Sequence, residues 1–428
     1  MELKRVVVTG MGAITPLGND VATTWQAALD GQSGAGPITH FDAVLYKTQF
    51  ACEVKDFDLK MAMLNPDDRA EMKEVRRTDL YSQYALAAAR QAIFDARLMD
   101  DGIDRNEVGV IFASGIGGLH TFEVEAGNFA RREADGPRFS PFFIPTMIAD
   151  IAAGHISMRY GLRGPNFGIV SACATSTNAM IDAFNYVRLG KAAAIVTGGS
   201  EAPIFPCGVG GFNAMHAIST RNDDPKGASR PFSASRDGFV MGEGSVCLVF
   251  EELEHALARG AKIYAEVIGG GLSADAHHIT APHPEALGAK LVMRRAIDDA
   301  GIQPADVDYV NVHGTSTPLG DIGEAMAIKE VFGEHAYKLN ISSTKSMTGH
   351  MLGATGAMEA LFCVMSCVHD IVPPTINHAD GDDDEQIDYK MNFTFNKAQR
   401  RQVNIALSNT FGFGGHNASI IVKKWNGV

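Results

Sequence analysis

The sequence predicts an α/β fold built from two duplicated α/β halves stacked in layers. Apolar, β-branched runs alternate with helical patterns along the chain, and this alternation is typical of layered α/β proteins with buried strands. In addition, the second part of the chain repeats the order of strand-like and helical patterns of the first part. The clearest strand-like runs of the first part are RVVVTG (5–10), VGVIFAS (108–114), FGIVSA (167–172) and AAIVTGG (193–199), with a helical pattern over 77–96.

Four segments of the second part match segments of the first. The first match is between 261–271 (AKIYAEVIGGG) and 4–12 (KRVVVTGMG), and the second is between 307–321 (VDYVNVHGTSTPLGD) and 108–118 (VGVIFASGIGG). The third is between 339–362 (LNISSTKSMTGHMLGATGAMEALF) and 166–184 (NFGIVSACATSTNAMIDAF). The fourth is between 402–415 (QVNIALSNTFGFGG) and 192–202 (AAAIVTGGSEA). The join falls near 250–262, where no linker rich in Pro, Gly or Ser separates the parts. We therefore expect one half at 1–255 and a second half at 256–428, sharing one interface.

Composition and charge limit the possible partners. The chain has 428 residues, of which 46% are hydrophobic, and its formal net charge is −13. This charge argues against nucleic acid as the main partner, because nucleic-acid binding needs a basic face. The six cysteines are too sparse for a disulfide scaffold and show no CxxC zinc spacing. The start is not that of a signal peptide, and no uninterrupted apolar run reaches membrane-spanning length, so we expect a cytoplasmic protein.

Two motifs that invite a binding site have simpler explanations. Gly10-x-Gly12 follows the first strand, but Thr15 stands where a dinucleotide site needs a third small residue. The pair therefore predicts a tight strand-to-helix turn. His277 and His278 are adjacent, so they do not share a helical face, and we expect them in a loop.

Two segments lack a regular period. Residues 127–147 look like an excursion from the first half. NHADGDDDEQIDYK (377–390) is predicted to be a solvated acidic loop, because it does not match the spacing of a calcium-binding loop.

The duplicated segments place reactive side chains at equivalent strand ends. Cys173 lies there in the first half, and His313 and His350 lie there in the second, with Lys345 five residues before His350. A cysteine at a helix start has its thiolate stabilised by the helix dipole and free amides, and the glycine-rich backbone of 411–415 supplies N–H groups for an oxyanion hole. Taken alone, Cys173 is more often a buried core residue, and each histidine is equally compatible with core packing.

Together the four residues suggest one chemistry. Two histidines that donate to the same oxygen would stabilise an enolate, which is the difficult intermediate of carbon–carbon bond formation from a thioester. A lysine beside a histidine disfavours imidazolium by like-charge repulsion and keeps the ring neutral.

Six motifs, in order, resemble those of the β-ketoacyl–acyl carrier protein synthases, which are condensing enzymes of the Cys-His-His type with the thiolase fold. The similarity covers essentially the whole chain and is greatest to the type II synthases. The motifs are VSACATS (170–176), GGFNAMHAISTRNDDPKGASRPF (210–232), RDGFVMGEGS (236–245), NVHGTSTPLGD (311–321), SSTKSMTGHMLGATGAMEA (342–360) and NTFGFGGHN (409–417). The resemblance implies a thiolase-like αβαβα arrangement and a decarboxylative Claisen condensation in fatty-acid elongation.

The resemblance also implies a role for each matching residue. Cys173 would accept the acyl chain, and the two histidines would bind the malonyl thioester carbonyl. Lys345 would tune the histidines, Glu359 would give structural support, and Phe413 would act as a gate and supply an amide to the oxyanion hole. Thr315 and Thr317 would donate hydrogen bonds to the phosphopantetheine arm. The acyl pocket would be lined by Ile116, Phe212 and, across a homodimer interface, Phe143. For Thr315 and Thr317 the alternative is capping of a helix start, and for the three apolar residues it is a plain core role.

The implied partner is an acidic acyl carrier protein, which delivers its own phosphopantetheine arm, so no metal or nucleotide is required. Because this chain is itself acidic, docking needs basic residues near the tunnel mouth. The candidates are Lys73, Arg76, Arg77, Arg131, Arg132 and Arg138. His416 and His216 depart from the family pattern, which affects the gating loop and the docking surface respectively.

Three other functions are compatible with part of this pattern. A thiolase needs a second cysteine in the C-terminal glycine-rich loop, and 411–417 has none. A cysteine hydrolase would pair Cys173 with one histidine and an orienting Asn or Asp, which leaves the second histidine and the duplication unexplained. A non-catalytic chain-length partner in a heterodimer would lack the nucleophile, whereas this chain has Cys173.

Overall fold

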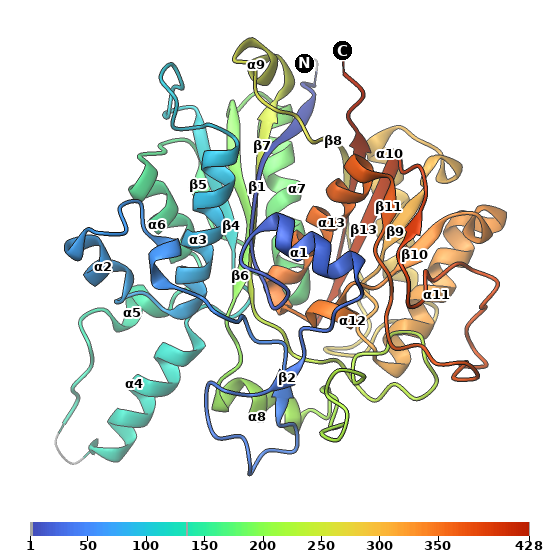
Figure 1. Cartoon of the computed structure of the whole chain (residues 1–428), viewed down its shortest axis with the longest axis horizontal. Helices are drawn as coiled ribbons and strands as arrows, with labels where there is room; N and C mark the ends of the chain where they lie inside the picture. Colours follow the sequence, from blue (N-terminus) through green and yellow to red (C-terminus); the bar gives the residue numbers. More distant parts are fainter. Residues whose placement is uncertain (1–2, 134–135, 428) are drawn as a thin grey trace.

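Ten strands form one continuous sheet through the centre of the protein. Figure 1 shows the computed structural model, which describes residues 3–133 and 136–427. The strands of the sheet are β1 (Val6–Ile14), β4 (Val108–Ala113), β5 (Asn166–Phe167), β6 (Ala194–Glu201), β7 (Gly244–Glu252), β8 (Ala265–Ala274), β9 (Tyr309–Asn311), β10 (Asn340–Ser342), β13 (Ile405–Gly412) and β14 (His416–Lys424). Two small two-stranded sheets pair β2 (Gly36–Pro37) with β3 (Phe50–Ala51) and β11 (Ile371–Val372) with β12 (Gln399–Arg400).

The strand order has the symmetry of a duplication. It runs β10-β9-β13-β14-β8-β1-β7-β6-β4-β5, with β1 and β8 antiparallel at the centre. Outward from β1 the order is β7, β6, β4, β5, and outward from β8 it is β14, β13, β9, β10. Each of the four matched pairs of segments therefore occupies equivalent places on the two sides, which confirms the predicted duplicated halves. The boundary between 255 and 256 stays a prediction; it falls within helix α9 (Leu253–Ala258), which links β7 to β8.

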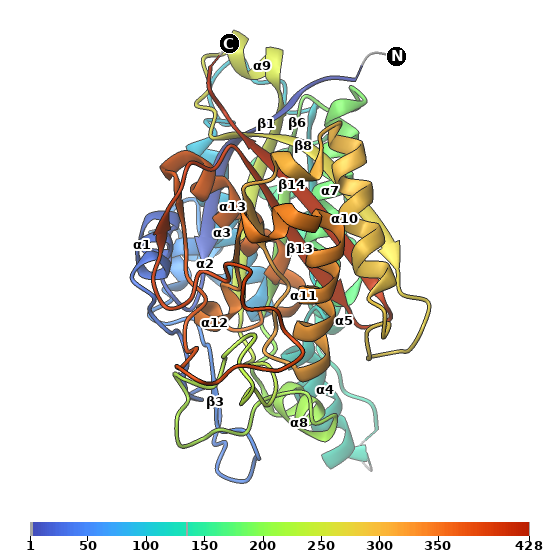
Figure 2. The same cartoon turned by 90° about the vertical axis from the view of Figure 1, so that its right-hand side faces the viewer.

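Helices form three layers around the two halves of the sheet (Figures 1 and 2). Helices α3 (Leu80–Asp95) and α6 (Ile151–Tyr160) pack on the outer face of the first half, and α10 (Leu287–Ala300) and α11 (Pro318–Phe332) pack on that of the second. Helices α7 (Thr175–Arg188) and α13 (Thr355–His369) lie between the halves. The other α-helices of the described residues, besides α9, are α1 (Val21–Leu29), α2 (Arg69–Val75), α4 (Leu119–Arg131), α5 (Phe143–Met147), α8 (Pro206–Ala214) and α12 (Lys345–Thr348).

The middle layer contains one segment with the length of a membrane span. Residues Leu352–His369 are long and apolar enough to cross a membrane by length and composition, although Glu359 interrupts the apolar run, so the expectation of no uninterrupted apolar run of that length is not contradicted. However, 89% of this window is buried inside the protein. Because α13 packs against strands of both halves, its apolar composition is explained by core packing.

The glycines of the first strand do not form the predicted turn. Gly10 and Gly12 lie inside β1, and α1 begins only at Val21. A Cβ atom on Gly12 would lie 2.0 Å from the Ala88 carbonyl oxygen of α3, and one on Gly10 would lie 2.2 Å from that of Ala92. The two glycines therefore allow α3 to pack directly on the strand backbone.

Two further expectations are corrected by the structure. Of the predicted strand 167–172, only Phe167 lies in a strand, which is β5 (Asn166–Phe167). The chain leaves the sheet edge at Gly168, where it passes so close to Asp150 that a Cβ would lie 2.9 Å from the Asp150 Cα. The excursion 127–147 is partly regular: its start continues α4, which projects from the body in Figure 1, and its end forms α5. Residues 134–135 of this segment lie outside the described residues.

Close packing of α3 on β1 gives a stability prediction. Replacing Gly12→Ala places a methyl group against a backbone carbonyl, and overpacking of this kind costs about 1–3 kcal/mol. We expect the free energy of unfolding, measured by denaturant titration, to fall by that amount. Gly36→Ala is the matched control, because Gly36 also lies in a strand and a Cβ there meets nothing within 4 Å. Equal unfolding free energies for the two variants would contradict this account of the packing.

Candidate active site

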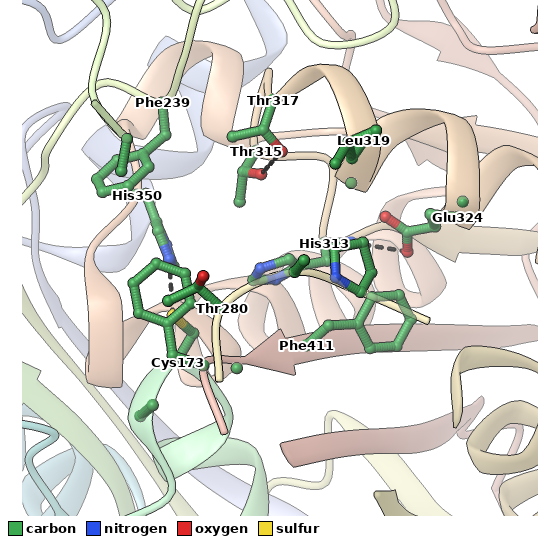
Figure 3. A pocket seen from close by; sticks show the side chains of 18 of the residues that line it. Cys173, Phe239, Thr280, His313, Thr315, Thr317, Leu319, Glu324, His350 and Phe411 are labelled. Atoms are coloured by element: carbon green, nitrogen blue, oxygen red, sulfur yellow. Dashed lines mark hydrogen bonds between the residues drawn. The ribbon is translucent and has the colours of Figure 1, made fainter. Parts of the chain in front are cut away.

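A cavity of about 600 Å³ opens where the ends of equivalent strands meet. The predicted site residues that line it are Ile116, Cys173, Phe212, His313, Thr315, Thr317, His350 and Phe413. Figure 3 shows Cys173 and the two histidines pointing toward one another at its base. The convergence of strand ends predicted from the duplication is therefore present, and it brings side chains from both halves into one space.

Cys173 lies in a turn that the duplication has copied. It is the middle residue of the 3₁₀ turn Ala172–Ala174 that precedes α7, and Leu352–Ala354 forms the equivalent turn before α13. Both turns begin with a non-glycine residue of positive φ, 52° at Ala172 and 45° at Leu352. Such a conformation is uncommon, and it aims the following side chain away from the helix axis. In the second half that following residue is Gly353, so only the first copy carries a nucleophile.

The backbone after β13 approaches the nucleophile closely. A Cβ on Gly412 would lie 3.1 Å from the Cys173 backbone nitrogen, so glycine is required for this contact. The approach brings the N–H of Phe413 to the Cys173 sulfur, where it lowers the pKa of the thiol. The N–H groups of Phe413 and Cys173 thus face the same point, as an oxyanion hole requires.

The charge state of Cys173 differs from the sequence expectation. Its side chain is buried, and burial raises the pKa of the thiol to about 11, against the lowering effects of the Phe413 amide and the Lys345 ammonium. Desolvation therefore raises the pKa of the thiol by more than the helix start lowers it. Without substrate, Cys173 is a neutral thiol rather than a stabilised thiolate.

His350 is fixed by contacts on both ring nitrogens. Its Nε2 lies 3.1 Å from the Cys173 sulfur, and its Nδ1 lies 3.1 Å from the Thr355 hydroxyl oxygen. That hydroxyl already accepts the Met351 N–H at 2.9 Å, which leaves its own proton for Nδ1. This arrangement favours the tautomer with the proton on Nε2, directed into the cavity.

His313 follows β9 and faces His350. The two rings are perpendicular, with centroids 5.3 Å apart. Its backbone N–H and that of Gly314 donate to the two carboxylate oxygens of Glu324, at 2.9 and 2.8 Å. Burial lowers the pKa of both imidazoles well below the usual value, and the Lys345 ammonium lowers it further. Both histidines are therefore neutral.

Lys345 forms a buried ion pair with Glu359. Each side chain is only 2% exposed, and the ammonium on α12 donates to the carboxylate on α13. Burial raises the pKa of Glu359, and the Lys345 ammonium opposes that rise. Neither side chain lines the cavity, and the tuning of the histidines by Lys345 and the structural support by Glu359 stay predictions.

The predicted binding residues fall into two groups. Thr315 and Thr317 lie on the cavity wall with their hydroxyl oxygens 3.0 Å apart, and Thr317 makes no side-chain cap for α11 although it is the cap residue. Phe212 and Ile116 lie on another part of the wall. Phe143 does not line the cavity. Its ring, at the start of α5, stacks on that of Phe139, with ring centroids 5.5 Å apart.

Sequence analysis missed three supporting residues. Glu201 ends β6 and accepts the N–H groups of Gly115, Ile116 and Gly353, so it fixes one wall of the cavity. Glu324 is the second, and its position inside the pattern of α11 gave no signal. Thr355 is the third, and it could have been found: Thr175 accepts the Ser171 N–H at 2.9 Å, exactly as its duplicated counterpart Thr355 does for Met351.

The two residues that depart from the family pattern lie near the cavity mouth. His216 lines the cavity at the end of α8 and has a positive φ of 54°. His416 begins β14, and a Cβ on Gly414 would lie 2.9 Å from its Nε2, so its ring lies against the glycine-rich turn. His277 and His278 lie in the loop after β8, as predicted.

Cys173, His313 and His350 are also close enough to bind a metal ion. One ligand atom of each lies within 4.8 Å of the others, and a thiolate with two imidazoles is a ligand set that suits zinc. The nearby Lys345 ammonium would repel a cation. The expectation that no metal is required stays a prediction.

Comparison with known proteins identifies a family model for each part of the chain. The family model described as the N-terminal domain of beta-ketoacyl synthase matches residues 3–256, and that of the C-terminal domain matches residues 264–379. A curated 3-oxoacyl-[acyl-carrier-protein] synthase 2 from Staphylococcus aureus strain N315 is 49% identical over 423 residues, which is 99% of each chain. The protein of the same name from Coxiella burnetii is 47% identical over 425 residues, again 99% of each.

Solved structures show the same fold. A beta-ketoacyl synthase from Burkholderia phymatum superposes with a TM-score of 0.89 at 32% identity, covering 99% of this chain and 100% of that one. A ketosynthase solved with its type II polyketide acyl-carrier protein and a bound hexaketide superposes with a TM-score of 0.85 at 30% identity, with the same coverage.

The raised pKa of Cys173 predicts how its reactivity depends on pH. The thiolate is the reactive form, so the alkylation rate with iodoacetamide should rise about tenfold per pH unit up to about pH 11. The rate is measured by intact mass in the Cys207→Ser variant, which removes the exposed cysteine. A rate that levels off at about pH 8.5, the ordinary range of a free cysteine, would contradict the account of burial.

Proposed function

The chain belongs to the β-ketoacyl synthase family and is an acyl-transferring condensing enzyme of fatty-acid elongation, and from this premise we propose a role for each residue of the cavity. The observation that carries the assignment is the meeting of Cys173, His313 and His350 at the base of one cavity, with their ligand atoms within 4.8 Å. The reaction is the decarboxylative Claisen condensation of a malonyl thioester with an acyl chain held on Cys173.

The first half-reaction is acyl transfer. The Cys173 sulfur attacks the thioester carbonyl of an acylated carrier, and the negative charge on oxygen is stabilised by the N–H groups of Cys173 and Phe413. The carbon–sulfur bond to the carrier arm then breaks, the proton of the Cys173 thiol passes to the departing thiol, and an acyl-enzyme is left. Because the thiol starts protonated, sulfur attack and proton loss have to be coupled.

The second half-reaction makes the carbon–carbon bond. A malonyl thioester places its carbonyl oxygen between the two neutral imidazoles, which donate hydrogen bonds to it. The bond to the carboxylate breaks, CO₂ leaves, and the electron pair forms an enolate. The enolate carbon attacks the acyl-enzyme carbonyl, and the Cys173 sulfur leaves and is reprotonated. The product is a β-ketoacyl thioester two carbons longer.

The carrier arm is proposed to lie along Thr315 and Thr317. Their hydroxyl groups line the cavity wall and are not used for helix capping, which supports a role in binding. The acyl chain is proposed to extend past Ile116 and Phe212. The partner is an acyl carrier protein, and the arm is its own phosphopantetheine, so no other cofactor is needed. Arg76 and Arg77, which follow α2, are the first candidates for docking this acidic partner.

A homodimer is proposed to complete the acyl pocket with Phe143 of the second copy. Strand β5 is one of the two end strands of the ten-stranded sheet, and β10 is the other. The segment 139–170, which contains β5, carries several exposed apolar side chains: Phe139, Phe142, Ile144, Ile148, Met158 and Val170. Burial of this surface by a second copy would explain its composition. A cytoplasmic location stays a prediction from the cysteine pattern.

The rival functions are weaker in the light of the site. A thiolase would need a cysteine in the turn 412–415, where the structure has Gly412, Phe413, Gly414 and Gly415. Solved relatives include ketosynthase and chain length factor pairs, but the position of the nucleophile is occupied here by Cys173. Chain-length preference and the choice between primary and specialised pathways need a series of acyl donors.

The proposed function is tested by separating the two half-reactions. Incubation with an acyl-carrier donor should add one acyl group to Cys173, measured by intact mass, and addition of malonyl-carrier should release CO₂ and a β-ketoacyl product. Cys173→Ala should lose the adduct. His313→Ala should keep the adduct but release CO₂ roughly 100-fold more slowly, because one donor to the enolate oxygen is missing.

Cys207→Ser serves as the control, since Cys207 is exposed and outside the cavity. An acyl adduct that persists in Cys173→Ala would refute the nucleophile, and unchanged CO₂ release by His313→Ala would refute the role of the histidine.

A further inference from the structure

The acidic loop 377–390 is the sequence feature that the reaction leaves unexplained. It was expected to be solvated, and it has no helix or long strand. Several of its side chains nevertheless point into the protein rather than into water. Asp384 is half-buried and lies 2.8 Å from a guanidinium nitrogen of Arg236, whereas Asp380 and Asp383 are exposed. The loop therefore has one acidic side chain committed to a buried partner.

Arg236 connects that loop to the start of α11. Its side chain is only 1% exposed. Nε donates to the Thr317 carbonyl at 3.2 Å, and Nη2 donates to the Pro318 carbonyl at 2.8 Å. Nη1 donates to the Ser233 carbonyl at 2.6 Å. Thr317 makes no side-chain cap of its own, and the guanidinium fastens the first turn of α11 together with Asp321, which accepts the Ser316 N–H.

The charge of Arg236 is balanced by two carboxylates at different distances. Asp384 is the closer one, and the nearest oxygen of Asp321 lies 3.4 Å away. The oxygens of Asp321 are also occupied, since they accept the N–H groups of Phe232 at 2.8 Å and Ser316 at 3.2 Å. A buried guanidinium needs counter-charge close by, and Asp384 makes the shorter of its two carboxylate contacts, 2.8 Å against 3.4 Å for the fully buried Asp321.

The rest of the loop fastens the segment that carries Arg236. Asp382 accepts the N–H of Ser235 at 2.8 Å and its hydroxyl at 2.6 Å, and the Tyr389 hydroxyl donates to the Phe232 carbonyl. The same segment continues to Asp237, Gly238 and Phe239, which line the cavity. The acidic loop thus supports, from outside, the wall on which Thr315 and Thr317 lie.

We propose that Asp384, acting through Arg236, is a positioning residue for the carrier arm: it holds the Thr315–Thr317 wall at the place where the arm of the thioester substrate binds. This inference rests on the proposed function of the cavity. Asp384 is not among the residues that line the cavity, so it touches neither the substrate nor Cys173. Its loss would let the start of α11 relax and shift the two hydroxyl groups, while the Cys173–His350 contact would stay intact.

The test compares two malonyl donors in steady-state kinetics. Malonyl-carrier protein presents the whole arm, whereas malonyl-N-acetylcysteamine presents only its thiol end. For Asp384→Ala we expect KM for malonyl-carrier to rise roughly tenfold, because a displacement of about 1 Å in a positioning group is enough for such a loss. We expect kcat to be unchanged, and both parameters for the short donor to be unchanged as well.

Three further variants complete the design. Asp384→Glu keeps the charge and should restore most of the lost affinity. Asp384→Asn keeps the shape but loses the charge, and it should raise KM less than Asp384→Ala does. It replaces Asp384→Ala in the test if thermal melting shows that the alanine variant is poorly folded. Asp380→Ala is the matched control, because Asp380 is an exposed acid of the same loop whose side chain makes no hydrogen bond or ion pair within the described residues.

The outcomes separate this inference from the function on which it rests. Unchanged KM for malonyl-carrier in folded Asp384→Ala and Asp384→Asn would overturn the inference, as would an equal rise for both donors or a fall in kcat alone. If the wild-type chain makes no β-ketoacyl product from either donor, it is the proposed function that fails.

Discussion

The buried ion pair between Lys345 and Glu359 sets the charge state on which the rest of the site depends. An ammonium in a site this dry is costly unless a carboxylate neutralises it, and Glu359 on α13 does so. The positive charge that remains close to the cavity base lowers the pKa of His313 and His350 beyond the effect of burial. Two neutral imidazoles can donate to an enolate oxygen, and neither has to lose a proton first. The pair thus affects the charge state of the histidines although neither of its side chains lines the cavity.

Duplication supplies the geometry, and departures from its symmetry supply the chemistry. The two turns that start α7 and α13 share positive φ at Ala172 and Leu352, and each is tied by a threonine hydroxyl. One copy places Cys173 after the strained residue, and the other places Gly353 there. The second copy has His350 just before its turn, so the nucleophile and its histidine come from equivalent turns that meet across the middle helix layer.

Much of this arrangement could be predicted from the sequence, because internal repetition places equivalent segments at equivalent strand ends. Cys173, His313 and His350 were found in this way. Two errors came from effects that pattern analysis does not see. Gly10 and Gly12 were assigned to a turn, whereas the packing of α3 on β1 requires them. The thiol of Cys173 was expected to be ionised, but its burial outweighs the helix start. Glu201 and Glu324 were missed because their carboxylates bind backbone N–H groups, which leave no periodic signal in the sequence.

The central claim is that both histidines stay neutral at the working pH, and NMR titration of ¹³C-labelled histidine tests it directly. With signals assigned by His313→Asn and His350→Asn, neither ring should change its shift between about pH 8 and about pH 5.5. In Lys345→Met the midpoints of both rings should move upward. Midpoints between about pH 6 and 7 for His313 or His350 in the wild-type chain would contradict the account.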